Sequence, residues 1–85
     1  MSAADRLTAK LAALAQQLRI GYSTAACVEL PELMTDLATQ VAAYPETRQQ
    51  AFSAQLTQAV QSWERHDWLG LADTLEYELA ETLAT

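Results

Sequence analysis

Large apolar residues return every three or four positions along nearly the whole chain. In the first segment the steps are four, three and four residues, at Leu7, Leu11, Leu14 and Leu18. Side chains at these intervals share one face of an α-helix, so the pattern predicts an amphipathic helix with a single apolar stripe. Three further stripes follow, and the chain has only two Gly and two Pro, too few for many tight turns. The sequence therefore predicts an all-α protein.

The predicted architecture is a small antiparallel bundle of three or four helices. Polar or proline-containing breaks divide the stripes into helices at residues 3–20, 31–44, 46–65 and 67–83. Because the breaks are short, helices that follow one another should pack antiparallel. A chain of 85 residues is the right size for one domain, and we expect residues 1–85 to form a single helical domain.

Several polar residues stand where helix N-termini are expected. Ser2 is a candidate N-cap for the first helix and Asp67 for the last, since their side chains can accept from free backbone N–H groups. The third helix has two candidate starts. Thr47 with Gln50 has the form of a capping box, and Pro45 suits the first position of a helix equally well.

Residues 21–30 are compatible with two structures. Gly21 either ends the first helix or only weakens a helix that continues through Ala25 and Val28. Pro31 is expected to begin the second helix, because proline is tolerated at the first helical position and not in the interior.

Charge and cysteine content restrict the function. Eleven acidic against five basic residues give a net charge of −6. Nucleic-acid binding is therefore not expected, because it depends on clustered Lys and Arg. No stretch has the length of a membrane span, and the N-terminus lacks the apolar core of a signal peptide. The single cysteine, Cys27, cannot form an internal disulfide, which agrees with a cytoplasmic protein.

The residues needed for catalysis or metal binding are mostly missing. One His and one Cys cannot provide the ligand pairs of a zinc site. His66 adjoins Asp67, but neighbouring residues on a helix do not face one another. The Glu-x-x-His pattern of di-iron bundles is also absent, because Trp63 stands three residues before His66. We expect no catalytic residues, no cofactor and no metal, hence no enzyme.

The last predicted helix carries the most informative surface. Between residue 67 and the C-terminus there are five acidic residues and no basic one. At 100° per residue, several polar residues, a tyrosine and a glycine fall on the side opposite the apolar stripe. This candidate partner-binding face consists of Gly70, Asp73, Glu76, Tyr77 and Glu81. An ordinary solvated acidic face with one exposed tyrosine is the alternative interpretation.

Residues 67–79 read DWLGLADTLEYEL. This segment resembles a C-terminal pattern, D-x-x-x-x-A-D-x-L-E-Y-E-L, of small uncharacterised helical proteins of bacteria. The resemblance implies a helical fold and a chaperone-like role. In those proteins a proline and an aromatic residue often follow the final leucine, and this chain lacks both.

The leading hypothesis is a non-enzymatic interaction module, an adaptor or chaperone-like bundle. It would bind another protein with a basic or mixed surface through the acidic last helix. A structural homo-oligomer is one alternative, because a monomer is expected to leave four large apolar residues partly uncovered, namely Ile20, Tyr22, Val28 and Leu69. A small-ligand binder with a pocket near Trp63 and Trp68 is the other.

Overall fold

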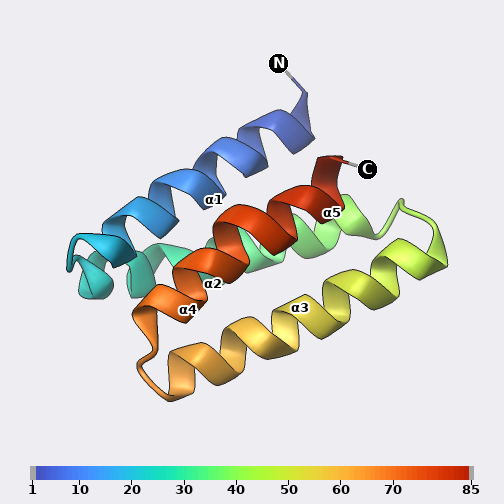
Figure 1. The fold of residues 1–85 in the computed structure, drawn as a ribbon. Coiled ribbons are helices and arrows are strands. Elements are labelled where there is room, and N and C mark those ends of the chain that lie inside the picture. Colours follow the sequence, from blue (N-terminus) through green and yellow to red (C-terminus); the bar gives the residue numbers. More distant parts are fainter. Residues whose placement is uncertain (1, 85) are drawn as a thin grey trace.

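Four helical rods run alternately in opposite directions (Figure 1). The computed structural model describes residues 2–84, and no strand occurs within that range. The first three rods are α1 (Ala3–Arg19), α2 (Ser23–Val41) and α3 (Glu46–Glu64). The fourth consists of α4 (Trp68–Asp73), the π-helix η1 (Thr74–Leu79) and α5 (Ala80–Ala84), which together are called the last helix. The prediction of an all-α antiparallel bundle is confirmed.

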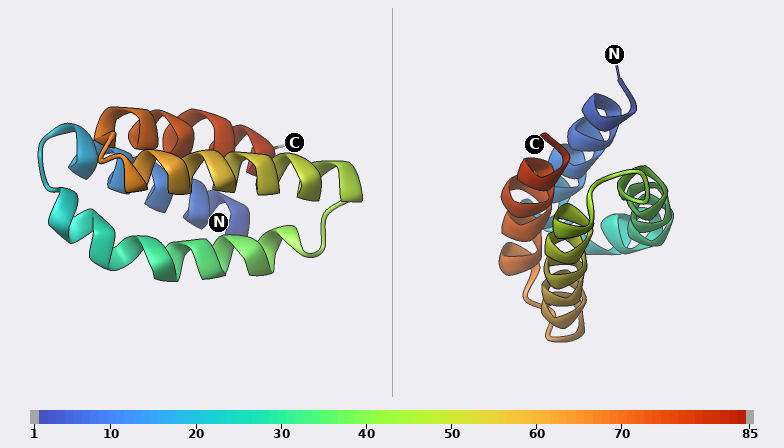
Figure 2. Two further views of the ribbon diagram at one scale, coloured as in Figure 1. Left: turned by 90° about the horizontal axis from the view of Figure 1, so that it is seen from below. Right: turned by 90° about the vertical axis from the view of Figure 1, so that its right-hand side faces the viewer.

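The four rods contribute unequally to one hydrophobic core. α1 packs between α2 and the last helix, and the last helix packs between α1 and α3 (Figure 2). Most of the buried side chains are leucines of α1, α2 and the last helix. From the 19 residues of α3, only Phe52 and Ala59 are buried. The core is therefore mainly built by three rods, and α3 covers it with one sparse stripe.

The π-helix follows from the spacing of the leucines in the last helix. Leu71, Leu75, Leu79 and Leu83 are separated by three steps of four residues, and all four are buried. In a continuous α-helix each such step turns about 40° beyond a full circle, so the stripe would drift by about 120°. A π turn holds more residues than an α turn and reverses part of this drift. η1 thus keeps all four leucines directed at the core.

Gly21 ends α1 and separates it from α2. Its φ of 97° lies in the left-handed region that glycine adopts without strain. The N–H of Tyr22 donates to the carbonyl of Gln17 at 2.8 Å, and the N–H of Gly21 donates to that of Leu18 at 3.4 Å. These are the two hydrogen bonds of a Schellman motif. Of the two structures compatible with residues 21–30, the chain adopts the one in which Gly21 terminates the first helix.

The predicted start of the second helix at Pro31 is wrong. α2 begins at Ser23 and ends at Val41, so Pro31 lies inside it. Proline has no N–H to offer the carbonyl four residues earlier, which normally disfavours an interior position. Here Ala26 and Leu30, both before the proline, are buried in the core. Burial of this first part of α2 outweighs the local cost of the proline.

The other helix ends agree closely with the sequence. Ser2 and Asp5 form a reciprocal capping box at the start of α1, and Asp67 accepts from the N–H of Gly70 at the start of α4. α3 begins at Glu46, the predicted first residue of the third helix, and Pro45 directly before it is the N-cap, so the alternative start with a Thr47 capping box is not adopted. Predicted ends at residues 20, 65 and 83 are within one residue of those observed. The predicted end of the second helix at residue 44 is wrong, because α2 ends three residues earlier, at Val41.

Candidate functional site

The structure places the five predicted site residues on all three parts of the last helix. Gly70 lies in the first turn of α4, Asp73 ends α4, Glu76 and Tyr77 lie in η1, and Glu81 lies in α5. Asp73, Tyr77 and Glu81 are exposed, and Gly70 and Glu76 are half-buried.

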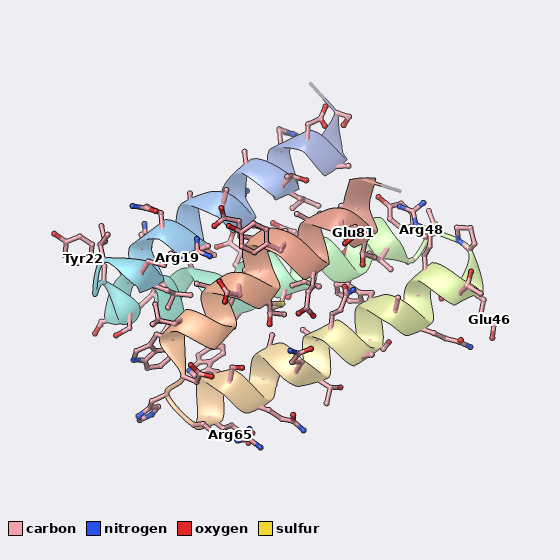
Figure 3. The ribbon with its side chains drawn as sticks, in the orientation of Figure 1. Arg19, Tyr22, Glu46, Arg48, Arg65 and Glu81 are labelled. Carbon is pink, nitrogen blue, oxygen red and sulfur yellow. The ribbon has the colours of Figure 1, made fainter. Side chains whose placement is uncertain are left out.

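Arg19, the last residue of α1, joins two of these acidic residues. Its Nη2 lies 2.9 Å from Oδ1 of Asp73, and its Nη1 donates to Oε2 of Glu76. The guanidinium also lies over the ring of Tyr77, 5.8 Å from the ring centre. Figure 3 shows Arg19 at the end of α1, beside the last helix. We call the cluster of Arg19, Leu69, Asp73, Glu76 and Tyr77 the Arg19 site.

The charge of the Arg19 site is determined by ion pairs between residues of the chain itself. The hydrogen bonds that Arg19 donates to Glu76 and Asp73 raise the pKa of Arg19 above its usual value. Arg19 therefore stays positively charged throughout the ordinary pH range. One guanidinium against two carboxylates leaves one negative charge in excess. The carboxylate of Asp73 remains 66% exposed and is accessible to a further cation.

Two large apolar side chains border this ion cluster. Tyr77 is 61% exposed, and Leu69, one turn before Asp73, is 64% exposed. Both belong to a helix whose opposite side is anchored by buried leucines, so the core determines that they face outward. Exposed apolar groups beside fixed charges are typical of protein-binding surfaces.

Gly70 has a structural explanation that does not involve a partner. A Cβ at this position would lie 2.4 Å from Oδ2 of Asp67, the N-cap residue of α4. The N–H of Gly70 donates to Oδ1 of the same carboxylate at 3.0 Å. A side chain at position 70 would therefore force the capping carboxylate to shift.

A second basic residue, Arg48, contacts the C-terminal end of the last helix. Nη2 of Arg48 donates to the carbonyl of Thr82 at 2.6 Å, and the guanidinium lies 3.9 Å from the ring centre of Tyr44. The hydroxyl of Tyr44 donates to the carbonyl of Leu83. A cation near the last carbonyls offsets the negative end of the helix dipole. Arg48 thus offsets the negative end of the last helix from within the chain.

The chain's single His and single Cys lie on different elements. His66 occupies the turn between α3 and α4, at a φ of 56°, and stacks on Trp68 with ring centres 5.2 Å apart. Cys27 is half-buried on α2. Within residues 2–84, no group of three or more His, Cys, Asp or Glu side chains is arranged to hold a metal ion.

Two hollows in the described part of the chain lie between α1 and α2. Their volumes are about 330 and 390 Å³, and they share Lys10 and Asp36 in their linings. Neither Trp63 nor Trp68, around which a ligand pocket was predicted, lines them. Those two tryptophans are half-buried against the core.

Sequence reasoning found the acidic face and missed its internal partner. Arg19 lies one residue after Leu18, the end of the first leucine stripe, and so at the edge of the core-facing side. In an antiparallel bundle whose first and last helices are neighbours, the end of the first lies beside the start of the last. These two facts together would have predicted the contact with Asp73.

Comparisons with known proteins do not assign the chain to a family. No protein-family model, no curated protein and no solved structure matches it. In the described part of the chain, every helix is too short or too polar to cross a membrane.

Proposed function

We propose that the chain is a non-enzymatic interaction module that binds another protein on the outer face of its last helix, at the Arg19 site. The observation that carries this proposal is the exposure of Leu69 and Tyr77 beside a fixed cluster of three charges. π-helical segments are rare and occur frequently at functional sites, and Glu76 and Tyr77 lie in one.

The partner has a basic or mixed surface. Tyr77 and Leu69 supply apolar contacts, and the exposed carboxylate of Asp73 accepts a hydrogen bond from a partner Lys or Arg. Because Arg19 already neutralises one of the two carboxylates, a single cation of the partner would complete the charge balance.

Affinity capture tests the proposal. The immobilised chain is incubated with lysate of its source organism, and retained proteins are identified for the wild type, Tyr77→Ala and Tyr22→Ala. Tyr22 is a matched control, since it is 62% exposed and points away from the last helix (Figure 3). We expect Tyr22→Ala to retain the wild-type partner and Tyr77→Ala to weaken its binding roughly tenfold, about 1.4 kcal/mol.

The same capture experiment can also contradict the proposal. If Tyr77→Ala and Leu69→Ala both retain the partner with wild-type affinity, the Arg19 site is not the binding surface. Affinity for the partner should also fall as salt is raised, because exposed charges are screened.

A further inference from the structure

The second surface of interest is the groove between α1 and α2. The two hollows that share Lys10 and Asp36 form one groove along both helices. Its apolar lining includes Leu7, Leu14 and Leu33, which are core residues seen from outside. α1 lies between this groove and the last helix, so the groove is separate from the Arg19 site.

Charges of opposite sign lie at opposite ends of this groove. One half is lined by Arg6, and the other half by Glu29 and Glu32, with Lys10 and Asp36 shared between the two. The basic half lies toward the start of α1 and the acidic half toward its end. Among residues 2–84, none of these five charges lies within ion-pair distance of an opposite charge.

A surface that is basic at one end and acidic at the other is complementary to itself. A two-fold axis that lies in the plane of the interface, perpendicular to the groove, brings the grooves of two copies face to face. It places the basic half of each copy over the acidic half of the other. The five charges sum to only −1, so this face adds little to the repulsion expected between two chains of charge −6. A partner that carries a single sign of charge would match one half and be repelled by the other.

We propose that the groove between α1 and α2 is a two-fold symmetric dimerisation surface, occupied by the same groove of a second copy of this chain. Arg6 and Lys10 of each copy pair with the acidic residues of the other. Val28, one turn before Glu32 and 75% exposed, is the apolar contact at the edge of the interface.

The size of the surface predicts a weak dimer. α1 is about 25 Å long at 1.5 Å per residue, and two packed helices give a face of roughly 500 Å² in projection. Standard interfaces bury about 800 Å² per partner, so the dimer belongs to the smaller class. We expect a dissociation constant on the order of 10 µM, which corresponds to about 7 kcal/mol.

Charge inversion with complementation tests the dimer. One variant inverts the basic half (Arg6→Glu with Lys10→Glu), and the other inverts the acidic half (Glu29→Lys with Glu32→Lys). Sedimentation equilibrium should find the wild type dimerising with concentration and each variant monomeric, because like charges then face each other. An equimolar mixture of the two variants should dimerise again, since both of its contacts are complementary and its total charge equals that of the wild-type dimer.

The controls separate this effect from folding and from net charge. Glu64→Lys and Arg65→Glu change charge at the exposed end of α3, outside the groove, and should leave the dimer intact. Circular dichroism confirms that each variant is folded. For the wild type, raising NaCl from about 0.05 M to 0.5 M should weaken the dimer, because its exposed ion pairs are screened.

Three results would overturn the proposal. The first is a wild-type chain that stays monomeric at a protein concentration of roughly fifty times the expected dissociation constant. The second is a dimer whose dissociation constant is unchanged by both charge inversions. The third is a mixture of the two variants that does not associate. A monomeric chain whose binding to a different protein is lost on inverting the basic half would assign the groove to a foreign helix instead.

Discussion

At the scale of single residues, the start of α4 shows how one glycine and one carboxylate depend on each other. Asp67 caps the helix by accepting from the N–H of Gly70, and the missing Cβ of Gly70 leaves space for that carboxylate. The two residues were interpreted differently from sequence, Asp67 as a cap and Gly70 as part of a binding face. The structure gives both a common local purpose.

This coupling predicts a change of sign in a double-mutant cycle. Asp67→Ala should lower the free energy of unfolding by about 1 kcal/mol through loss of the cap. Gly70→Ala should also destabilise the wild type, because its methyl group displaces the same carboxylate. In the Asp67→Ala background, Gly70→Ala should instead stabilise by about 0.5 kcal/mol, since alanine favours a helix over glycine. Urea unfolding measures all four proteins, and simple additivity would contradict the coupling.

At the scale of secondary-structure elements, the sequence predicts the regular helices and their caps correctly, and it misses the two irregular features, the interior proline of α2 and the π turn of the last helix. The stripe from Leu7 to Leu18 predicts α1 correctly, because every leucine of the stripe is buried in the core and the core therefore holds the helix in place. The prediction for α2 is wrong because Ala26 and Leu30, which precede Pro31, pack into the core and hold the helix together across the proline. The π turn was also missed, although three equal steps of four residues from Leu71 to Leu83 contain its signal.

The interior proline of α2 has a measurable cost. Pro31→Ala restores a backbone N–H at the ninth position of the helix and removes the clash of the ring with the preceding turn. We expect the free energy of unfolding to rise by about 1–3 kcal/mol. Pro45→Ala, at the N-cap of α3, serves as the control and should change stability by no more than about 0.5 kcal/mol. If Pro31→Ala is no more stable than the wild type, α2 is not continuous through residue 31.

At the scale of the whole molecule, stability is unevenly distributed. α1 and α2 each bury five side chains, whereas α3 buries two, Phe52 and Ala59. Local opening is easiest where the fewest apolar contacts are lost. α3 is therefore the element expected to detach first, while α1, α2 and the last helix hold the core.

Hydrogen exchange measures this order directly. Backbone amides of α3 should exchange at least roughly tenfold faster than those of α1 and the last helix, a difference of about 1.4 kcal/mol in opening free energy. Phe52→Leu should accelerate exchange in α3 more than elsewhere, because it removes part of the larger of its two buried side chains. Equal protection in all four rods would show that the bundle opens only as a unit.

The candidate site shows the same limits of sequence reasoning as the fold. The exposed positions of Asp73 and Tyr77 follow from the helical period of the last helix and agree with the prediction. The contact with Arg19 depends on which helices are neighbours, and periodicity within one helix contains no such information. Ile20, Tyr22, Val28 and Leu69 were correctly expected to be uncovered in a monomer.

The π-helix implies that the chain carries one residue more than its leucine core requires. Deleting Glu78 would change the steps between the four leucines of the last helix from four, four and four to four, three and four. Those are the steps of the stripe in α1, which an ordinary α-helix satisfies without widening. The shortened chain should fold with the same core. The two leucines that follow the deletion should still face inward, now as part of an ordinary α-helix. The additional residue thus widens the helix in the segment that carries Glu76 and Tyr77, although the spacing of the leucines does not require it.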